Sequence, residues 1–110
     1  MEVKAITKYV RIAPEKVRDL TREIQGKSVA EALNITEFSE RKAALHVGKT
    51  LKSAIANAEH NNGMSVENLM VKMAVVEEGP TIRRGWYGAR GMFKPIGRRM
   101  SHIRIVVSDE

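Results

Sequence analysis

The alternation of apolar and polar residues predicts a strand followed by a helix at the start of the chain. Residues 3–12 alternate weakly and include β-branched side chains and a tyrosine, which indicates a strand. Apolar residues then recur at helical spacing after Pro14 and stop before Gly26. Proline is tolerated at the first helical position and glycine commonly follows the last, so residues 14–25 are expected to form a short amphipathic helix.

Two further helices are expected before the middle of the chain. Ser28 and Glu31 have the spacing of a capping box, which predicts a second helix to about Asn34. Ser39 is expected to cap a third helix over residues 40–61. The buried stripe predicted for this helix is Ala44, Val47, Leu51, Ile55 and Ala58. Its many alanines predict close approach to a neighbouring helix or sheet.

Two strands are predicted in the second half of the chain. Residues 68–78 and 102–108 both alternate and are rich in β-branched side chains. The residues expected on one face of the first strand are Leu69, Val71, Met73 and Val75. The apolar positions of the second strand are Ile103, Ile105 and Val107.

The segment between these strands is too long for a structureless loop in a small domain. A β-hairpin whose two strands extend beyond the packed part of the domain accounts for this segment better. If position 77 pairs near position 103, the midpoint falls at Arg90, and residues 81–84 face residues 96–99. Each arm then reaches about 40 Å, at roughly 3.3 Å per residue.

The composition is that of one folded domain. The chain has 110 residues, 43% of them hydrophobic, and it contains no cysteine. Disulfides and cysteine-based zinc sites are therefore excluded. Lys4, Lys8 and Arg11 interrupt the N-terminal segment, so no signal peptide is expected, and no apolar run has the roughly 18 residues of a membrane helix.

Positive charge is concentrated in one segment. Residues 1–78 carry 12 basic and 11 acidic side chains, whereas residues 79–108 carry 7 basic and no acidic ones. A localised positive segment is typical of a protein with a polyanionic partner.

The stretch RRGWYGARGMFKPIGRR, residues 83–99, is the centre of this segment. Arg side chains pair bidentately with phosphate, and Trp86, Tyr87 and Phe93 can stack on splayed bases, as in many RNA-binding proteins. The strand predicted after this stretch argues against a disordered tail. We therefore interpret it as a nucleic-acid-binding hairpin, with a small packed aromatic cluster as the alternative.

Other classes of function fit the residues less well. His46, His60 and His102 have no zinc-type spacing, and no nucleophile elbow or Walker pattern occurs, so no enzyme activity, cofactor or metal is expected. A GXXG pattern at residues 88–91 is weak support for a KH module. An architectural nucleic-acid-binding protein with a basic β-arm and a protein–protein adaptor stay open as alternatives.

The chain resembles the large-subunit ribosomal protein L twenty-two family, bacterial type, over essentially its whole length. The strings that carry the resemblance are RIAPEKVR at 11–18, IQGKSVAEAL at 24–33, LKSAIANAEHNNG at 51–63, VVEEGPTIRR at 75–84 and RRMSHIRIVVSD at 98–109. The resemblance implies a single α+β domain, with three helices packed on a small three-stranded antiparallel sheet and a long extended β-hairpin. The body would comprise about residues 1–80 and 100–110, and the hairpin about 81–99.

The resemblance also implies a function and partners. The protein would be a structural constituent of the large ribosomal subunit that binds 23S-type rRNA, supports assembly and acts in the cytoplasm. Its hairpin would extend along the wall of the peptide exit tunnel, near ribosomal protein L four and the nascent peptide. No membrane association and no homo-oligomer are expected.

Three groups of residues are expected to bind rRNA. By resemblance, the first strand and helix contribute Arg11, Lys16 and Arg18, and the end of the long helix contributes Asn57, His60 and Asn61. The hairpin and its return contribute Arg83, Arg84, Trp86, Tyr87, Arg90, Lys94, Arg98, Arg99 and His102. The chain departs from the family pattern at Ala13, where serine is usual, at Tyr87-Gly88, where proline-arginine is usual, and at Met92, where a basic residue is usual.

Overall fold

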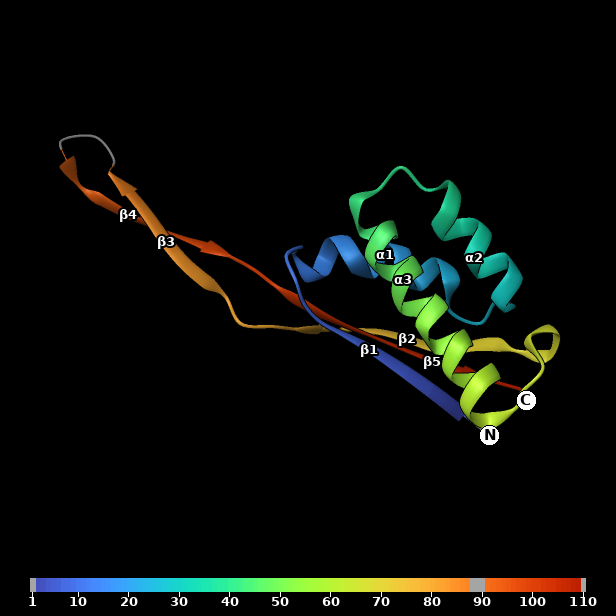
Figure 1. Cartoon of the computed structure of the whole chain (residues 1–110). Helices are drawn as coiled ribbons and strands as arrows, with labels where there is room; N and C mark the ends of the chain where they lie inside the picture. The colour runs from blue at the N-terminus through green and yellow to red at the C-terminus, as the bar shows by residue number, and fades with distance from the viewer. Residues whose placement is uncertain (1, 88–90, 110) are drawn as a thin grey trace.

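The computed structural model describes residues 2–87 and 91–109 and has an α+β architecture (Figure 1). Three strands form an antiparallel sheet in the order β1–β5–β2, and β3 pairs with β4 in a separate two-stranded sheet. The strands are β1 Glu2–Val10, β2 Met70–Glu78, β3 Ile82–Tyr87, β4 Phe93–Arg98 and β5 Ser101–Ser108. The helices are α1 Pro14–Ile24, α2 Val29–Phe38 and α3 Lys42–Ala56, with a π-helical turn at Asn57–Asn61 and a 3-10 turn at Val66–Asn68. The predicted α+β class, with three helices on a three-stranded antiparallel sheet, is confirmed.

The three helices cover one face of the three-stranded sheet (Figure 1). Inward-facing side chains of the sheet pack against the apolar faces of α1 and α3, which removes their surface from water. The largest fully buried side chains include Val17, Leu20, Ile24, Val47, Leu51, Ile103, Ile105 and Val107. The alternation predicted for residues 102–108 is therefore confirmed.

The end of α1 is tied to the sheet through a turn. Gly26 has φ of +83°, a left-handed conformation that glycine adopts without steric cost. Its N–H donates to the carbonyl of Val71 at 2.8 Å, and the N–H of Val71 donates to the carbonyl of Lys27 at 2.9 Å. The turn that ends the helix thus joins the edge of β2.

The second helix is longer than predicted. It continues past Asn34 to Phe38. Thr36, in the added turn, is buried, and its hydroxyl donates to the carbonyl of Leu33 at 3.0 Å. Thr36 also packs close to Gly48 of α3. Tertiary packing on α3 therefore supports a turn that the sequence alone did not indicate.

The two predicted helix caps have different outcomes. The hydroxyl of Ser28 accepts a hydrogen bond from the N–H of Glu31 at 3.4 Å, which confirms the cap of α2. The prediction that Ser39 caps the third helix is wrong. Ser39 follows the end of α2 and accepts a hydrogen bond from the N–H of Arg41, whereas α3 begins at Lys42.

A β-bulge interrupts β2. Val71 pairs with Val107, but Met73 pairs with Val106, so Lys72 is an extra residue on this strand. A bulge of this kind reverses the alternation of side chains beyond it, because successive residues of a strand point to opposite faces.

The bulge overturns the predicted inward face of this strand. Ala74 and Val76 are buried, whereas Met73 is 40% exposed and Val75 is half-buried. The expectation that Met73 and Val75 share one face with Val71 is therefore wrong. Val71 lies before the bulge and stays buried, and the residues after it are shifted by one position.

The strands β3 and β4 form a ribbon that projects away from the helices (Figure 1). Their register begins with Ile82 opposite Arg98 and continues as far as Tyr87. Residues 81–84 were predicted to face residues 96–99, and the pairing along β3 confirms that arrangement.

Candidate nucleic-acid interface

Basic residues recur along both strands of the ribbon. Backbone pairing places Arg84 opposite Ile96 and Trp86 opposite Lys94. The predicted RNA-binding residues on the two strands are Arg83, Arg84, Trp86, Tyr87, Lys94 and Arg98. Arg90 lies outside the described residues. Because no acidic residue occurs between positions 79 and 108, the sequence supplies nothing within the ribbon to neutralise these cations.

The predicted residues of the first strand and helix have unequal surroundings. Arg11 and Lys16 are exposed. Arg18 is half-buried, and its Nη2 donates to the backbone carbonyl of Val76 at 3.3 Å, which links α1 to β2. Arg18 therefore has a role in the fold, while Arg11 and Lys16 are accessible to a partner.

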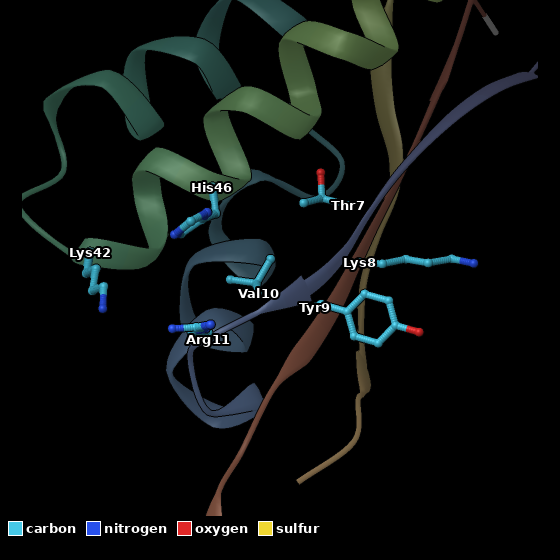
Figure 2. Close-up of a pocket in the computed structure, with 7 residues that line it drawn as sticks. All are labelled: Thr7, Lys8, Tyr9, Val10, Arg11, Lys42 and His46. Atoms are coloured by element: carbon cyan, nitrogen blue, oxygen red, sulfur yellow. The ribbon is translucent and has the colours of Figure 1, made fainter. Parts of the chain in front are cut away.

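A hollow of about 410 Å³ lies where β1 ends beside the start of α3 (Figure 2). Its lining residues are Thr7, Lys8, Tyr9, Val10, Arg11, Lys42 and His46. Figure 2 shows Arg11, Lys42 and His46 on the side of α3, whereas the side chains of Lys8 and Tyr9 extend the opposite way. The sequence did not indicate that Lys42 and His46 share a surface with Arg11, because only the fold brings these residues together.

Tyr9 occupies a strained position at the end of β1. Its φ is +60°, a left-handed value that is uncommon for a residue other than glycine. The Tyr9 N–H donates to Nδ1 of His102 at 3.0 Å, and the two rings meet edge to face with centroids 5.0 Å apart. Since Nδ1 accepts this bond, Nε2 is the ring nitrogen that His102 can offer to a partner.

The predicted set at the end of the long helix lies on the π-helical turn. Asn57 donates through Nδ2 to the carbonyl of Lys4 at 3.5 Å, while His60 and Asn61 are exposed. Helical periodicity gave no sign of this π-helical turn. Such turns are frequent at functional sites, and this one brings the three predicted residues onto one short segment.

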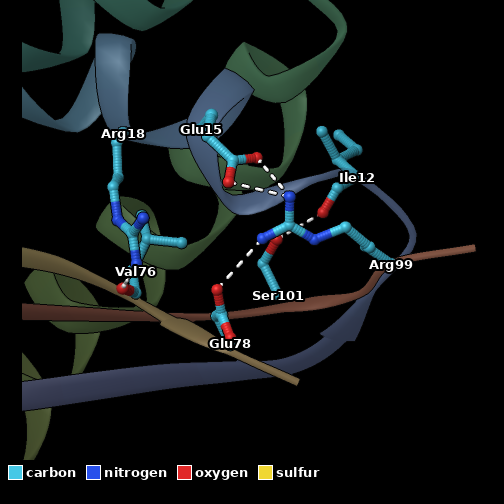
Figure 3. A network of polar contacts seen from close by, with 7 residues as sticks. All are labelled: Ile12, Glu15, Arg18, Val76, Glu78, Arg99 and Ser101. Carbon is cyan, nitrogen blue, oxygen red and sulfur yellow. Dashed lines mark hydrogen bonds and ion pairs between the residues drawn. The ribbon is translucent and has the colours of Figure 1, made fainter. Parts of the chain in front are cut away.

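Arg99 joins the root of the ribbon to the body (Figure 3). Its Nη1 contacts both carboxylate oxygens of Glu15 at 2.8 and 2.9 Å, and its Nη2 donates to Glu78 at 3.0 Å. Ser101, two residues later, is buried and donates to the carbonyl of Ile12. Arg99 was predicted to bind RNA, but in this structure its guanidinium bridges α1 and β2.

This network perturbs the acid–base properties of its members. A hydrogen bond from its own backbone N–H, and next the Arg99 guanidinium, hold the pKa of the Glu15 carboxyl below its ordinary value. In turn, the hydrogen bond to Glu15 raises the pKa of Arg99. Both side chains are exposed, so water screens their attraction and the contact mainly fixes orientation.

The described part of the chain offers neither a metal-ion site nor a membrane-spanning helix. Within residues 2–87 and 91–109, His, Asp and Glu side chains do not gather into a group of three that could hold a metal ion. In the same part of the chain, none of the helices has the length and apolar character needed to cross a membrane.

Comparison with known proteins gives one consistent result. Residues 5–108 match the family described as ribosomal protein L22p/L17e. The chain is 50% identical to large ribosomal subunit protein uL22 of Opitutus terrae over 109 residues, which are 99% of this chain and 96% of that protein. It is 49% identical to the protein of the same name from Akkermansia muciniphila over 110 residues, which are 100% of this chain and 98% of that protein. The chain therefore belongs to the ribosomal protein L22p/L17e family.

Proposed function

We propose that this protein is a structural constituent of the large ribosomal subunit and binds its rRNA. The observation that carries the proposal is an identity of about one half, over nearly the full length of both chains, to proteins named large ribosomal subunit protein uL22. The family is one of ribosomal proteins, not of enzymes. As a ribosomal constituent the protein acts in the cytoplasm.

The basic ribbon supports rRNA as the partner. Its two strands place Arg and Lys residues along one projecting element without acidic neighbours in sequence. Arginine pairs bidentately with phosphate, and neutralising phosphates releases counterions from the RNA. A projecting two-stranded element can also enter a space that a compact domain cannot, which suits binding within folded RNA.

The finer placement is part of the same proposal. We assign the ribbon to the wall of the peptide exit tunnel, near ribosomal protein L four and the path of the nascent peptide. This placement follows from the resemblance of the chain to its family. It requires an element that is long, narrow and positively charged, and the projecting ribbon and its basic sequence support that requirement.

Salt dependence of RNA binding tests the proposal. Binding of the protein to a transcript of large-subunit rRNA would be measured between 50 and 300 mM KCl. If six or seven phosphates are neutralised, the slope of log affinity against log salt should be on the order of −4 to −6. A nearly flat response, or a protein that washes off large subunits at low salt, would contradict the proposed function.

A further inference from the structure

The junction between the body and the ribbon is irregular. Residues 79–81 connect β2 to β3, whereas only residues 99–100 connect β4 to β5. Among the described residues, one backbone hydrogen bond crosses this junction, from the N–H of Gly79 to the carbonyl of Met100 at 2.9 Å. Strand connections of unequal length bend a sheet locally, so backbone pairing alone leaves the direction of the ribbon weakly fixed.

Small rotations at the junction move the far end of the ribbon a long way. The strands β3 and β4 have six residues each and project from the body (Figure 1). At roughly 3.3 Å per residue they span about 20 Å, so a rotation of about 20° displaces the far end by about 7 Å. Contacts that fix the junction therefore determine where the basic residues of the ribbon meet RNA.

Arg99 is the side chain of the junction that makes such contacts (Figure 3). Its Nη1 lies 2.8 and 2.9 Å from the two carboxylate oxygens of Glu15 on α1, and its Nη2 lies 3.0 Å from Glu78 at the end of β2. The guanidinium is a rigid planar fork, so two carboxylates on different nitrogens define its orientation. We call these three residues the clasp.

We propose that Glu15 and Glu78 are positioning residues for RNA binding, because they hold Arg99 and thereby fix the direction in which the ribbon leaves the body. A ribbon already held in its bound direction loses less conformational freedom on binding. The inference rests on the proposed function. It reverses the ordinary expectation for acidic residues, which repel phosphate and oppose binding to RNA.

The sign of an affinity change tests the clasp. Glu15→Gln and the double variant Glu15→Gln/Glu78→Gln would be compared with the wild type for affinity to the large-subunit rRNA transcript. Although they remove negative charge, both should weaken binding, by roughly two- to five-fold, the range expected for an exposed ion pair. In an Arg99→Gln background, Glu15→Gln should no longer weaken binding, because its partner is absent.

Glu23→Gln is the matched control. Glu23 is exposed in the last turn of α1, and it is not one of the carboxylates that contact Arg99. This variant should bind as well as the wild type or slightly better, because it only removes a negative charge. All variants should keep the wild-type unfolding midpoint near pH 7, since exposed ion pairs contribute little to stability. A loss of affinity then reports orientation rather than unfolding.

Spin labels measure the direction of the ribbon in the free protein. The chain has no cysteine, so Lys52→Cys on α3 and Met92→Cys just before β4 would carry the only two labels. Both positions are exposed. The distribution of distances between the labels should be broader in Glu15→Gln/Glu78→Gln than in the otherwise wild-type protein, and Glu23→Gln should keep the narrower width. Equal widths in all three would contradict the clasp.

The outcomes separate the two proposals. Steep salt-dependent binding by the wild type, with Glu15→Gln binding at least as tightly as Glu23→Gln, would overturn the positioning role and leave the proposed function intact. Absence of salt-dependent binding by the wild type would contradict both. Weaker binding by Glu15→Gln that persists unchanged in the Arg99→Gln background would also overturn the inference, because the effect would not pass through Arg99.

Discussion

Arg99 and Glu15 are in contact although 84 positions separate them, with Nη1 of the arginine 2.8 Å from one carboxylate oxygen and 2.9 Å from the other. The contact connects the link between β4 and β5 to the first turn of α1. A second contact, from Arg99 to Glu78 at 3.0 Å, connects the same guanidinium to the end of β2. The root of the ribbon is thus fixed to both the helical layer and the sheet.

The Arg99 contact predicts a specific dependence of stability on pH. The pKa of Glu15 in the folded protein lies below its unfolded value of about 4.5. Its ionised carboxylate therefore stabilises the fold fully at pH values above about 4.5, and this stabilisation is lost as the pH falls through the folded pKa. In Arg99→Gln the folded pKa moves back toward 4.5. Wild-type protein should therefore lose more stability than Arg99→Gln between pH 5 and pH 3.

Urea unfolding at several pH values measures this difference. Near pH 7 the exposed pair should matter little, because exposed ion pairs contribute weakly. Glu2, whose pKa is lowered by Lys72, titrates in the same range but equally in both proteins. Arg22→Gln, which removes an exposed arginine from the last turn of the same helix, is the control and should keep the wild-type pH profile. Parallel profiles for Arg99→Gln and wild type would refute the linkage.

Two leucines on α3 give opposite predictions for stability. Leu51 is fully buried, whereas Leu45 is 62% exposed. Leu51→Ala should lower the free energy of unfolding by about 2–5 kcal/mol, because it removes apolar contacts and leaves a cavity. Leu45→Ala should change it by about 0.5 kcal/mol or less. Both are measured by urea unfolding, and equal losses would show that the core is not where the fold places it.

The hydroxyl of Ser101 is predicted to stabilise the root of the ribbon. It is buried and donates to the carbonyl of Ile12, so Ser101→Ala leaves that acceptor without this partner. The expected loss is about 1–3 kcal/mol in the free energy of unfolding. Ser53→Ala, at an exposed position of α3, is the control and should be nearly neutral. A neutral Ser101→Ala would mean that the bond to Ile12 contributes nothing.

Periodicity predicted most elements because local pattern and final packing agree for them. The stretch from Pro14 to Gly26 has a helix start, an apolar stripe and a stop signal, and all three are used in α1. The hairpin register was predicted to within one residue, since Glu77 pairs with His102 where a partner near 103 was expected. Two long alternating strands leave few ways to pair that bury one face of each.

The features that the sequence did not predict depend on contacts between residues far apart in the chain. The sequence around Lys72 alternates like an ordinary strand, and only its pairing with β5 reveals the extra residue. The left-handed backbone at Tyr9 depends on a bond to His102, 93 positions away. The hollow could not be predicted either, because Arg11 and Lys42 come from different elements. Local pattern carries no information on such contacts.

The ribbon and the sheet should differ in hydrogen exchange. The pair β3–β4 is a two-stranded sheet, whereas β2 and β5 belong to a three-stranded sheet covered by helices. Isolated two-stranded ribbons are marginal in water, and basic residues along this one add repulsion. Paired amides at 82–87 and 93–98 should therefore exchange faster in the free protein than paired amides at 70–78 and 101–108.

Binding should reverse much of this difference. If the ribbon binds rRNA, its amides should become protected when the large-subunit transcript is added, because phosphates neutralise the repulsion between its cations. Amides of β2 and β5 supply the internal reference and should change little. The measurement is exchange followed by mass spectrometry, with and without RNA, at low salt. Equal protection of ribbon and sheet in the free protein would contradict the first expectation. Ribbon amides that stay unprotected in the complex would show that the body alone binds the RNA.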